Sequence, residues 1–133
     1  MWNEPKTDWK SGDAVIWTDY NRIKNNIEYL KQRTEDLCGP VTNYQTMGID
    51  KTYTDFYYAD EFNAFENNIA QINSVVYPQD IGAKQTFYDN GAFISSAEMN
   101  RLETACKLIK DALDNIKPTR IPFKLGAYKD IRI

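Results

Sequence analysis

The chain has 133 residues, of which 42% are hydrophobic and 26% charged, and its formal net charge is −3. This composition is typical of one globular domain with a modest core, and we expect that domain to span residues 1–133. Acidic and basic residues are interspersed without a basic stripe, which argues against nucleic-acid binding. No run approaches the ~18 apolar residues of a membrane span, and the start of the chain lacks the apolar core of a signal peptide. We therefore expect synthesis in the cytoplasm without export by the usual route.

The first predicted helix covers about residues 18–38 and is centred on the sequence T-D-Y-N-R-I-K-N-N-I around Asn21. Thr18 can cap this helix, and Asp19 suits the positive end of the helix dipole. Gly39 followed by Pro40 gives a stop signal. Apolar residues recur every three or four positions, which places them on one helical stripe. That stripe consists of Tyr20, Ile23, Ile27, Leu30 and Leu37, with Thr34 at the skipped position.

The second and third predicted helices cover about residues 60–76 and 96–117 and repeat the same stripe around Asn63 and Asn100. Asp60 is the expected cap of the second helix. Ser95 and Glu98 have the spacing of a capping box before the third. The two stripes are Phe62, Phe65, Ile69, Ile72 and Val76, and Met99, Leu102, Cys106, Ile109, Leu113 and Ile116. Three coincident stripes predict a mainly α fold, a small bundle of three helices with a shared core.

The repeated asparagines Asn21, Asn63 and Asn100 are predicted to be structural. Each lies one residue after the first stripe position, in the first turn, where a side-chain amide can bond exposed backbone groups. We expect each to fix the preceding segment onto its own helix. A second pair of asparagines, 25–26 and 67–68, is replaced in the third repeat by Thr104 and Ala105. The domain therefore contains three degenerate repeats of decreasing similarity.

The connections 39–59 and 77–95 are longer than the loops of most compact domains. They are rich in aromatic residues, which make up 14% of the chain. We expect them to be extended segments that either pack aromatic side chains over the helices or pair as minor short strands. Residues 118–133 alternate in polarity, as expected of an extended arm that folds back or is given to a neighbour. The candidate partner-binding residues are Trp2, Trp9, Trp17, Tyr57, Tyr58, Phe123 and Tyr128.

Catalytic signals are missing from the sequence. The chain has no histidine, which removes the commonest general base and most zinc sites. No phosphate-binding loop is present, and the carboxylate clusters lack the spacing of a calcium loop. Cys38 and Cys106 are expected to be reduced thiols, although a disulfide between them is left open. We predict no catalytic, cofactor-binding or metal-binding residues.

The segment from Pro5 to Leu30 resembles a pattern in tail and minor structural proteins of bacteriophages and prophages of Gram-positive bacteria. It reads P-K-T-D-W, a spacer, and then D-Y-N-R-I-K-N-N-I-E-Y-L. The second repeat is similar at E-F-N and N-N-I, and the third keeps E-M-N-R-L. This resemblance implies a virion component of the tail tip, baseplate or fibre base. In such proteins the motif usually accompanies longer fibre or receptor-binding regions, which this sequence lacks.

The favoured hypothesis is a non-enzymatic virion protein, made in the bacterial host cytoplasm, that acts as an assembly or adaptor module. Its partners would be other phage tail or baseplate proteins, with a homo-oligomer left open and no nucleic acid or membrane involved. The alternative is a small carbohydrate-binding module that recognises host cell-wall glycans through exposed aromatic side chains. A lytic or processing enzyme that uses paired acids is a weaker third hypothesis.

Overall fold

The computed structural model describes residues 2–76, 78–89, 91 and 93–116. These residues form three α-helices and no strand: α1 (Trp17–Leu37), α2 (Ala59–Val75) and α3 (Ser96–Asp114). The predicted mainly α three-helix bundle is therefore confirmed. The minor strands that were considered do not form within this part of the chain.

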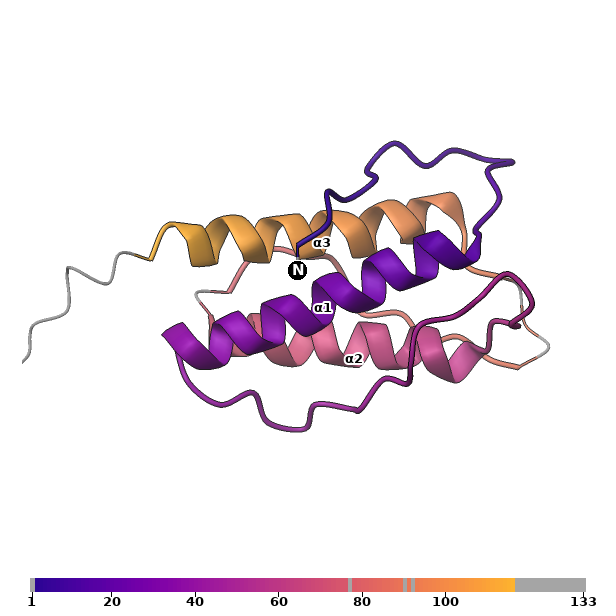
Figure 1. The fold of residues 1–133 in the computed structure, drawn as a ribbon. Coiled ribbons are helices and arrows are strands. Elements are labelled where there is room, and N and C mark those ends of the chain that lie inside the picture. Colours follow the sequence, from indigo (N-terminus) through magenta and orange to yellow (C-terminus); the bar gives the residue numbers. More distant parts are fainter. Residues whose placement is uncertain (1, 77, 90, 92, 117–133) are drawn as a thin grey trace, which may run out of the picture.

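The three helices run in the same direction, with all their N-terminal ends at one end of the bundle (Figure 1). Contacts between α1 and α3 agree with this arrangement. Arg22, near the start of α1, pairs with Glu103 on α3 at 2.7 Å. Arg33, near the end of α1, pairs with Asp114 at the end of α3. The first turns of α1 and α2 meet through the rings of Tyr20 and Phe62, 6.1 Å apart.

Parallel helices explain the long connections. After each helix the chain must return along the bundle before the next helix can begin, and 21 residues of α1 extend over ~32 Å. Antiparallel neighbours would need only a short turn. We call the three returning or entering segments lead-ins: residues 2–16 before α1, 38–58 before α2 and 76–95 before α3. Figure 1 shows their described residues, which leave out 77, 90 and 92, running beside the helices as irregular chain.

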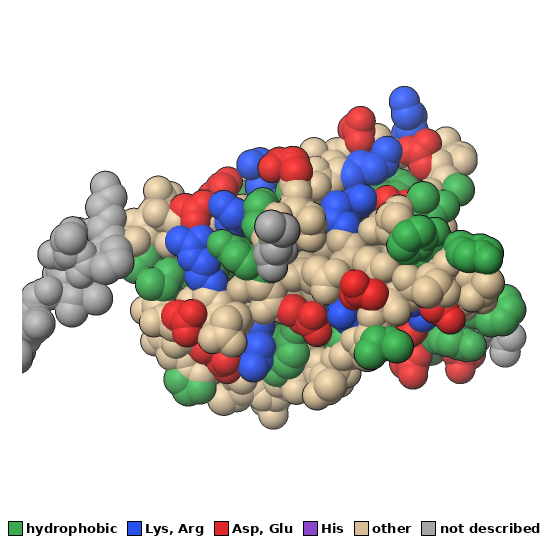
Figure 2. Space-filling view, viewed as in Figure 1, with side chains coloured by type: hydrophobic (Ala, Val, Ile, Leu, Met, Phe, Trp, Pro, Cys, Tyr) green, Lys and Arg blue, Asp and Glu red, His purple; other side chains and the backbone are tan. Residues whose placement is uncertain are grey.

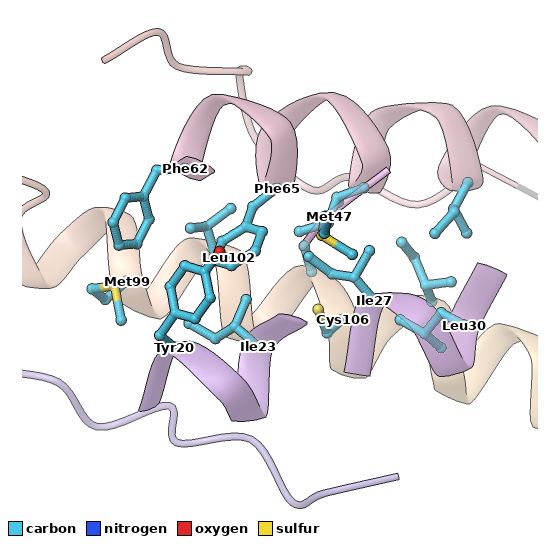
Figure 3. Close-up of a cluster of buried hydrophobic side chains, with 14 of the residues drawn as sticks. Tyr20, Ile23, Ile27, Leu30, Met47, Phe62, Phe65, Met99, Leu102 and Cys106 are labelled. Atoms are coloured by element: carbon cyan, nitrogen blue, oxygen red, sulfur yellow. The ribbon is translucent and has the colours of Figure 1, made fainter. Parts of the chain in front are cut away.

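The core is formed by the predicted stripes. Ile27, Leu30, Phe65, Ile72 and Leu102 are fully buried. Figure 3 shows stripe residues of all three helices meeting along one interior, with Met47 of the second lead-in among them. Fully burying one such side chain stabilises the fold by ~1.5–3 kcal/mol. The lead-ins add further buried apolar residues to this core: Trp9, Val41, Met47 and Ile94.

Helix starts agree with the prediction only in part. Ser95 caps α3, and its hydroxyl accepts the Glu98 amide at 3.3 Å. Thr18 and Asp60 are not caps, because α1 and α2 begin after Ile16 and Tyr58. The exposed backbone N–H groups of those two residues instead donate to the carboxylates of Asp19 and Glu61. These bonds are one half of a capping box, and no described side chain caps the first-turn N–H groups of α1 or α2.

Helix ends are close to the predicted stops. After α1, the N–H groups of Cys38 and Gly39 both donate to the Thr34 carbonyl. Gly39 has φ +145°, a conformation that a residue with a Cβ rarely adopts. The third helix ends at Asp114, with Asn115 as its C-cap, earlier than predicted.

Candidate functional site

The repeated asparagines hold the lead-ins through paired hydrogen bonds. In each pair the side-chain amide donates to the carbonyl of a lead-in residue and accepts the N–H of that same residue. The N–H bonds measure 2.7 Å (Lys51 to Asn21), 2.7 Å (Phe87 to Asn63) and 2.8 Å (Trp9 to Asn100). The three return bonds measure 2.8–2.9 Å. We call this arrangement an amide clamp.

The partners of these clamps are cyclic. Asn21 on α1 holds the lead-in of α2, Asn63 on α2 holds the lead-in of α3, and Asn100 on α3 holds the lead-in of α1. The expectation that each Asn holds the lead-in of its own helix is therefore wrong. The bundle has approximate threefold symmetry within one chain, since each lead-in is clamped by the preceding helix in the cycle.

The second asparagines complete the attachment of the first two lead-ins. Asn26 clamps Asn3 with two bonds of 2.8 Å, and Asn68 clamps Gln45 in the same way. These clamps lie on the helix that follows the lead-in, so each of these segments is bonded to both helices that flank it. The third repeat has buried Ala105 at this position and therefore lacks the clamp.

Two buried carboxylates, each three positions after a clamping Asn, connect neighbouring helices and lead-ins. Glu103 is 1% exposed and pairs with Arg22 of α1. It also accepts the Lys6 N–H at 3.0 Å and the Trp9 indole N–H at 2.6 Å. Glu66 has the equivalent place on α2 and pairs with Arg101 of α3. The third equivalent pair is absent, because its positions are occupied by Lys24 and Ala64.

The clamps made by Asn21, Asn63 and Asn100 are each followed at once by a tight turn at the end of the bundle where the helices begin. The Asp13, Asp55 and Gly91 N–H groups donate to the carbonyls of Lys10, Thr52 and Tyr88. In the first two turns an aspartate carboxylate also accepts a backbone N–H, at 3.1 Å from Lys10 and 2.7 Å from Thr52. The clamps therefore fix the position of the turns, and the turns lead into the helix starts.

Lys51 organises the second of these turns. Its ammonium group donates to the Phe56 carbonyl at 2.8 Å and pairs with Glu61 at 2.7 Å. It also lies 4.8 Å from the ring centre of Tyr20, 5.9 Å from that of Tyr57 and 5.7 Å from that of Tyr58. A buried cation with several partners holds this aromatic segment in one conformation.

Exposed aromatic residues gather on these turns and helix starts. In the described part of the chain, eight large hydrophobic residues are exposed, and all except Ile49 lie there, with exposed fractions of 38–83%. We call this surface the aromatic end. Figure 2 shows apolar side chains gathered at the end of the molecule where the helices begin, with acidic side chains beside them. It comprises Ile16, Trp17, Tyr53, Phe56, Tyr58, Tyr88 and Phe93.

A cavity of about 290 Å³ opens on the aromatic end between the start of α2 and the turn of the third lead-in. Its walls include Tyr58, Phe62, Tyr88 and Phe93, and Asp89 is the carboxylate at its edge. The ring centres of Phe62 and Phe93 lie 5.8 Å apart in edge-to-face geometry. Such a cavity suits an apolar or aromatic group that carries a positive charge beside it.

The candidate partner-binding residues fall into three groups. Trp17 and Tyr58 belong to the aromatic end. Trp9 is only 6% exposed and belongs to the core, whereas Trp2 and Tyr57 are half-buried, with Trp2 packed against Tyr29. Phe123 and Tyr128, with the whole proposed arm, lie outside the described residues. The other residues of the aromatic end were not predicted from the sequence: Ile16, Tyr53, Phe56, Tyr88 and Phe93. Their place between the repeated Lys-containing segments and the helix starts was a signal that could have indicated them.

Among the titratable groups in the helices, burial shifts the pKa values of Cys106 and Glu66. Burial raises the pKa of the Cys106 thiol, which disfavours the reactive thiolate. Cys38 is exposed, and both thiols are free. Burial also raises the pKa of Glu66, an effect that Arg101 partly offsets. No group of three or more metal-binding side chains occurs in the described segments. None of their helices combines the length and apolarity that a bilayer crossing requires.

No protein-family profile, curated protein or solved structure matches this chain.

Proposed function

We propose that this chain is a non-enzymatic structural protein of a bacteriophage virion, a tail, baseplate or fibre-attachment component that acts as an assembly adaptor. The observation that carries the proposal is the gathering of exposed aromatic residues at one end of the bundle. Contiguous exposed apolar surface is characteristic of protein–protein interfaces, and aromatic residues are enriched in them. The resemblance of residues 5–30 to phage structural proteins supplies the viral context.

The way the aromatic end is built supports an adaptor role. Its three turns follow the clamps made by Asn21, Asn63 and Asn100, so the backbone beneath the aromatic residues is held before a partner arrives. A preformed surface loses little conformational entropy on binding. The buried carboxylates Glu66 and Glu103 are occupied by arginines and backbone N–H groups, so these two carboxylates serve structure.

Incorporation into particles tests this proposal. We expect mass spectrometry of density-purified phage particles, induced from the bacterium that carries the gene, to detect peptides of this chain. Complementation with W17S/Y58S should leave the protein folded by circular dichroism and absent from particles. The matched control is I49S, which removes a 90% exposed side chain outside the aromatic end and should be incorporated normally. Wild-type protein found only in the soluble fraction would contradict the proposal.

The cavity favours a second candidate function, recognition of cell-wall glycans. Sugar rings stack on aromatic side chains, and a carboxylate can accept hydrogen bonds from their hydroxyl groups; Tyr58, Tyr88 and Asp89 offer both. We would then expect purified wild-type protein to sediment with cell walls of the host and Y88A to remain in the supernatant. Equal, background-level sedimentation of both proteins would remove this candidate.

A further inference from the structure

Charge is distributed unequally between the aromatic end and the residues that follow the bundle. The segments 8–19, 50–61 and 87–98, which carry the turns and helix starts, contain nine acidic residues and two lysines. Six of the nine acidic residues are paired with a lysine or arginine: Asp8, Asp13, Asp19, Asp50, Glu61 and Glu98. Within the described residues, Asp55, Asp60 and Asp89 remain as carboxylates without an ion pair. Residues 117–133 contain five basic residues and one aspartate. The aromatic end therefore offers three unpaired carboxylates, and the segment 117–133 has an excess of basic residues.

The apolar residues of the two regions are also complementary. Residues 117–133 carry large apolar side chains separated by basic ones, as in I-P-F-K-L and Y-K-D-I-R-I. The aromatic end offers a cavity of about 290 Å³ with aromatic walls and Asp89 at its edge. Exposed Asp55 and Asp60 lie on the neighbouring turn and helix start. An aromatic side chain next to a lysine, such as Phe123 beside Lys124, has the chemistry that this surface would accept.

We propose that residues 117–133 of one copy dock onto the aromatic end of a second copy, so that molecules join head to tail. The inference rests on the proposed function, because it identifies a first partner for the assembly surface. Opposite charges would steer the encounter, and aromatic contacts would provide most of the affinity. Since the donating and accepting surfaces differ, the interface is heterologous, and each bound copy leaves another aromatic end free.

The parallel bundle favours a second copy over the same copy as the acceptor. The end of α3 lies at the opposite end of the bundle from the aromatic end (Figure 1). To reach its own aromatic end the chain would have to travel back along the 19 residues of α3, ~28 Å. That path would use about half of the ~56 Å that the 17 residues 117–133 could span if fully extended. The grooves along it already hold lead-ins, clamped by Asn26, Asn68 and Asn63. A second copy stacked end to end requires no return.

Two full-length variants test the proposal, F56S/F93S at the aromatic end and F123S/Y128S in the segment 117–133. Wild-type protein should show a mass that rises with concentration above 15.5 kDa in sedimentation equilibrium. Each variant alone should associate at least about ten-fold more weakly. An equimolar mixture should form a pair of twice the monomer mass, because one variant keeps the donor and the other keeps the acceptor. Higher salt should weaken association of the wild type.

Folding and specificity are controlled separately. Both residues of F56S/F93S are more than half exposed. If that variant nevertheless loses its helical circular dichroism, Y53S/Y88S replaces it, with residues that are 83% and 72% exposed. The I49S variant should associate like the wild type.

Three outcomes would overturn the proposal. Wild-type protein that stays monomeric up to about 0.5 mM would do so, because the segment would then bind its own bundle or nothing. A mixture that fails to pair, or variants that each still associate, would place the interface elsewhere. Incorporation into particles is measured independently. Its persistence in a chain that does not self-associate would remove this inference and leave the proposed function standing.

Discussion

The first and third lead-ins occupy equivalent grooves of the bundle but are attached differently. The first is clamped at Asn3 and at Trp9, and Glu103 accepts two more of its N–H groups. The third is clamped at Phe87, and Glu66 accepts only the Gln85 N–H, at 3.3 Å. Its far end is held by a further amide clamp from the preceding helix α2, in which Asn73 donates to the Gln79 carbonyl at 3.0 Å and accepts the N–H of the same residue at 2.9 Å. What all three repeats share is the clamp next to the aromatic end, so the fold fixes that end most consistently.

Removing the buried carboxylates should expose the largest difference between the two lead-ins. Glu103→Ala leaves the Lys6 N–H and the Trp9 indole without their acceptor and leaves Arg22 with Asp19 alone. We expect a loss of ~3–5 kcal/mol, the usual cost of breaking a buried pair. Glu66→Ala should cost less, because the only described lead-in group that donates to Glu66 is the Gln85 N–H, at 3.3 Å. Each arginine keeps a second carboxylate, Glu98 for Arg101 and Asp19 for Arg22. Urea unfolding followed by circular dichroism measures both, and equal losses would show that the additional bonds of Glu103 contribute nothing.

The amide clamps should follow the same order with smaller effects. Asn100→Ala leaves the N–H and carbonyl of Trp9 without their partners, and because these bonds are only part-buried we expect a total loss of ~1–3 kcal/mol. Asn63→Ala does the same to Phe87. Because Phe87 is only half-buried, water can replace the lost bonds there. We expect the free energy of unfolding to fall more for Asn100→Ala. The reverse order in denaturant midpoints would contradict this account.

Asn26→Ala should remove from the first lead-in the clamp that the third repeat lacks at the equivalent helix position. The substitution removes the clamp on Asn3 and places Ala where the third repeat has Ala105. Because the clamp on Trp9 remains, we expect a loss of ~1–2 kcal/mol. Faster amide exchange should be confined to residues before Lys6. Exchange that quickens equally across α1 would show that this clamp supports the whole bundle.

The pH dependence of stability should be the smallest effect, and it can distinguish the contribution of Glu66 from that of Asp114. Burial raises the pKa of Glu66 in the folded protein, so the folded state holds this proton more tightly than the unfolded chain does. The stability that Glu66 contributes is present below the ordinary value of 4.5 and is lost as pH rises through the raised value. The melting temperature of wild type relative to Glu66→Gln should therefore fall as pH rises from about 4 to about 7.

Asp114 is the matched control with the opposite sign. Lys110 and Arg33 lower the pKa of Asp114, so its contribution is present above the ordinary value of 3.8. It is lost as pH falls through the lowered value. The wild type should therefore lose its advantage over Asp114→Asn only in acid. Parallel curves for the two comparisons would show that neither shift affects stability.

The helices could be predicted from the sequence because their periodicity is local. A stripe such as Ile23, Ile27 and Leu30 needs only the geometry of one helix. The start of α3 was also predictable, since Ser95 caps it directly. The starts of α1 and α2 were misplaced because neither helix has a capping side chain among the described residues. Asp19 and Glu61, inside the helices, instead accept the N–H groups of Ile16 and Tyr58.

Direction and partnership could not be predicted, because they are properties of the assembled bundle. An apolar stripe reads the same in a parallel and an antiparallel arrangement, although the length of the connections was a hint. The amide of Asn21 was expected to serve its own helix, yet its partner Lys51 lies 30 residues further along. The buried positions of Glu66 and Glu103 were missed as well. Their identical place after the repeated Asn was a signal that could have indicated a shared role.

The cyclic order of the clamps has a consequence for synthesis on the ribosome. The first lead-in is secured by α3, since Trp9 and Asn100 are separated by 91 positions. While the chain emerges, α1 and α2 can meet, but one flank of α1 stays uncovered until residues 96–114 have been made. Contacts so distant in sequence form late and slowly. Asn3 can bind Asn26 as soon as α1 has formed, but the stretch from Lys6 to Trp9 must wait for α3. A prematurely ended chain would lack the helix that holds this stretch.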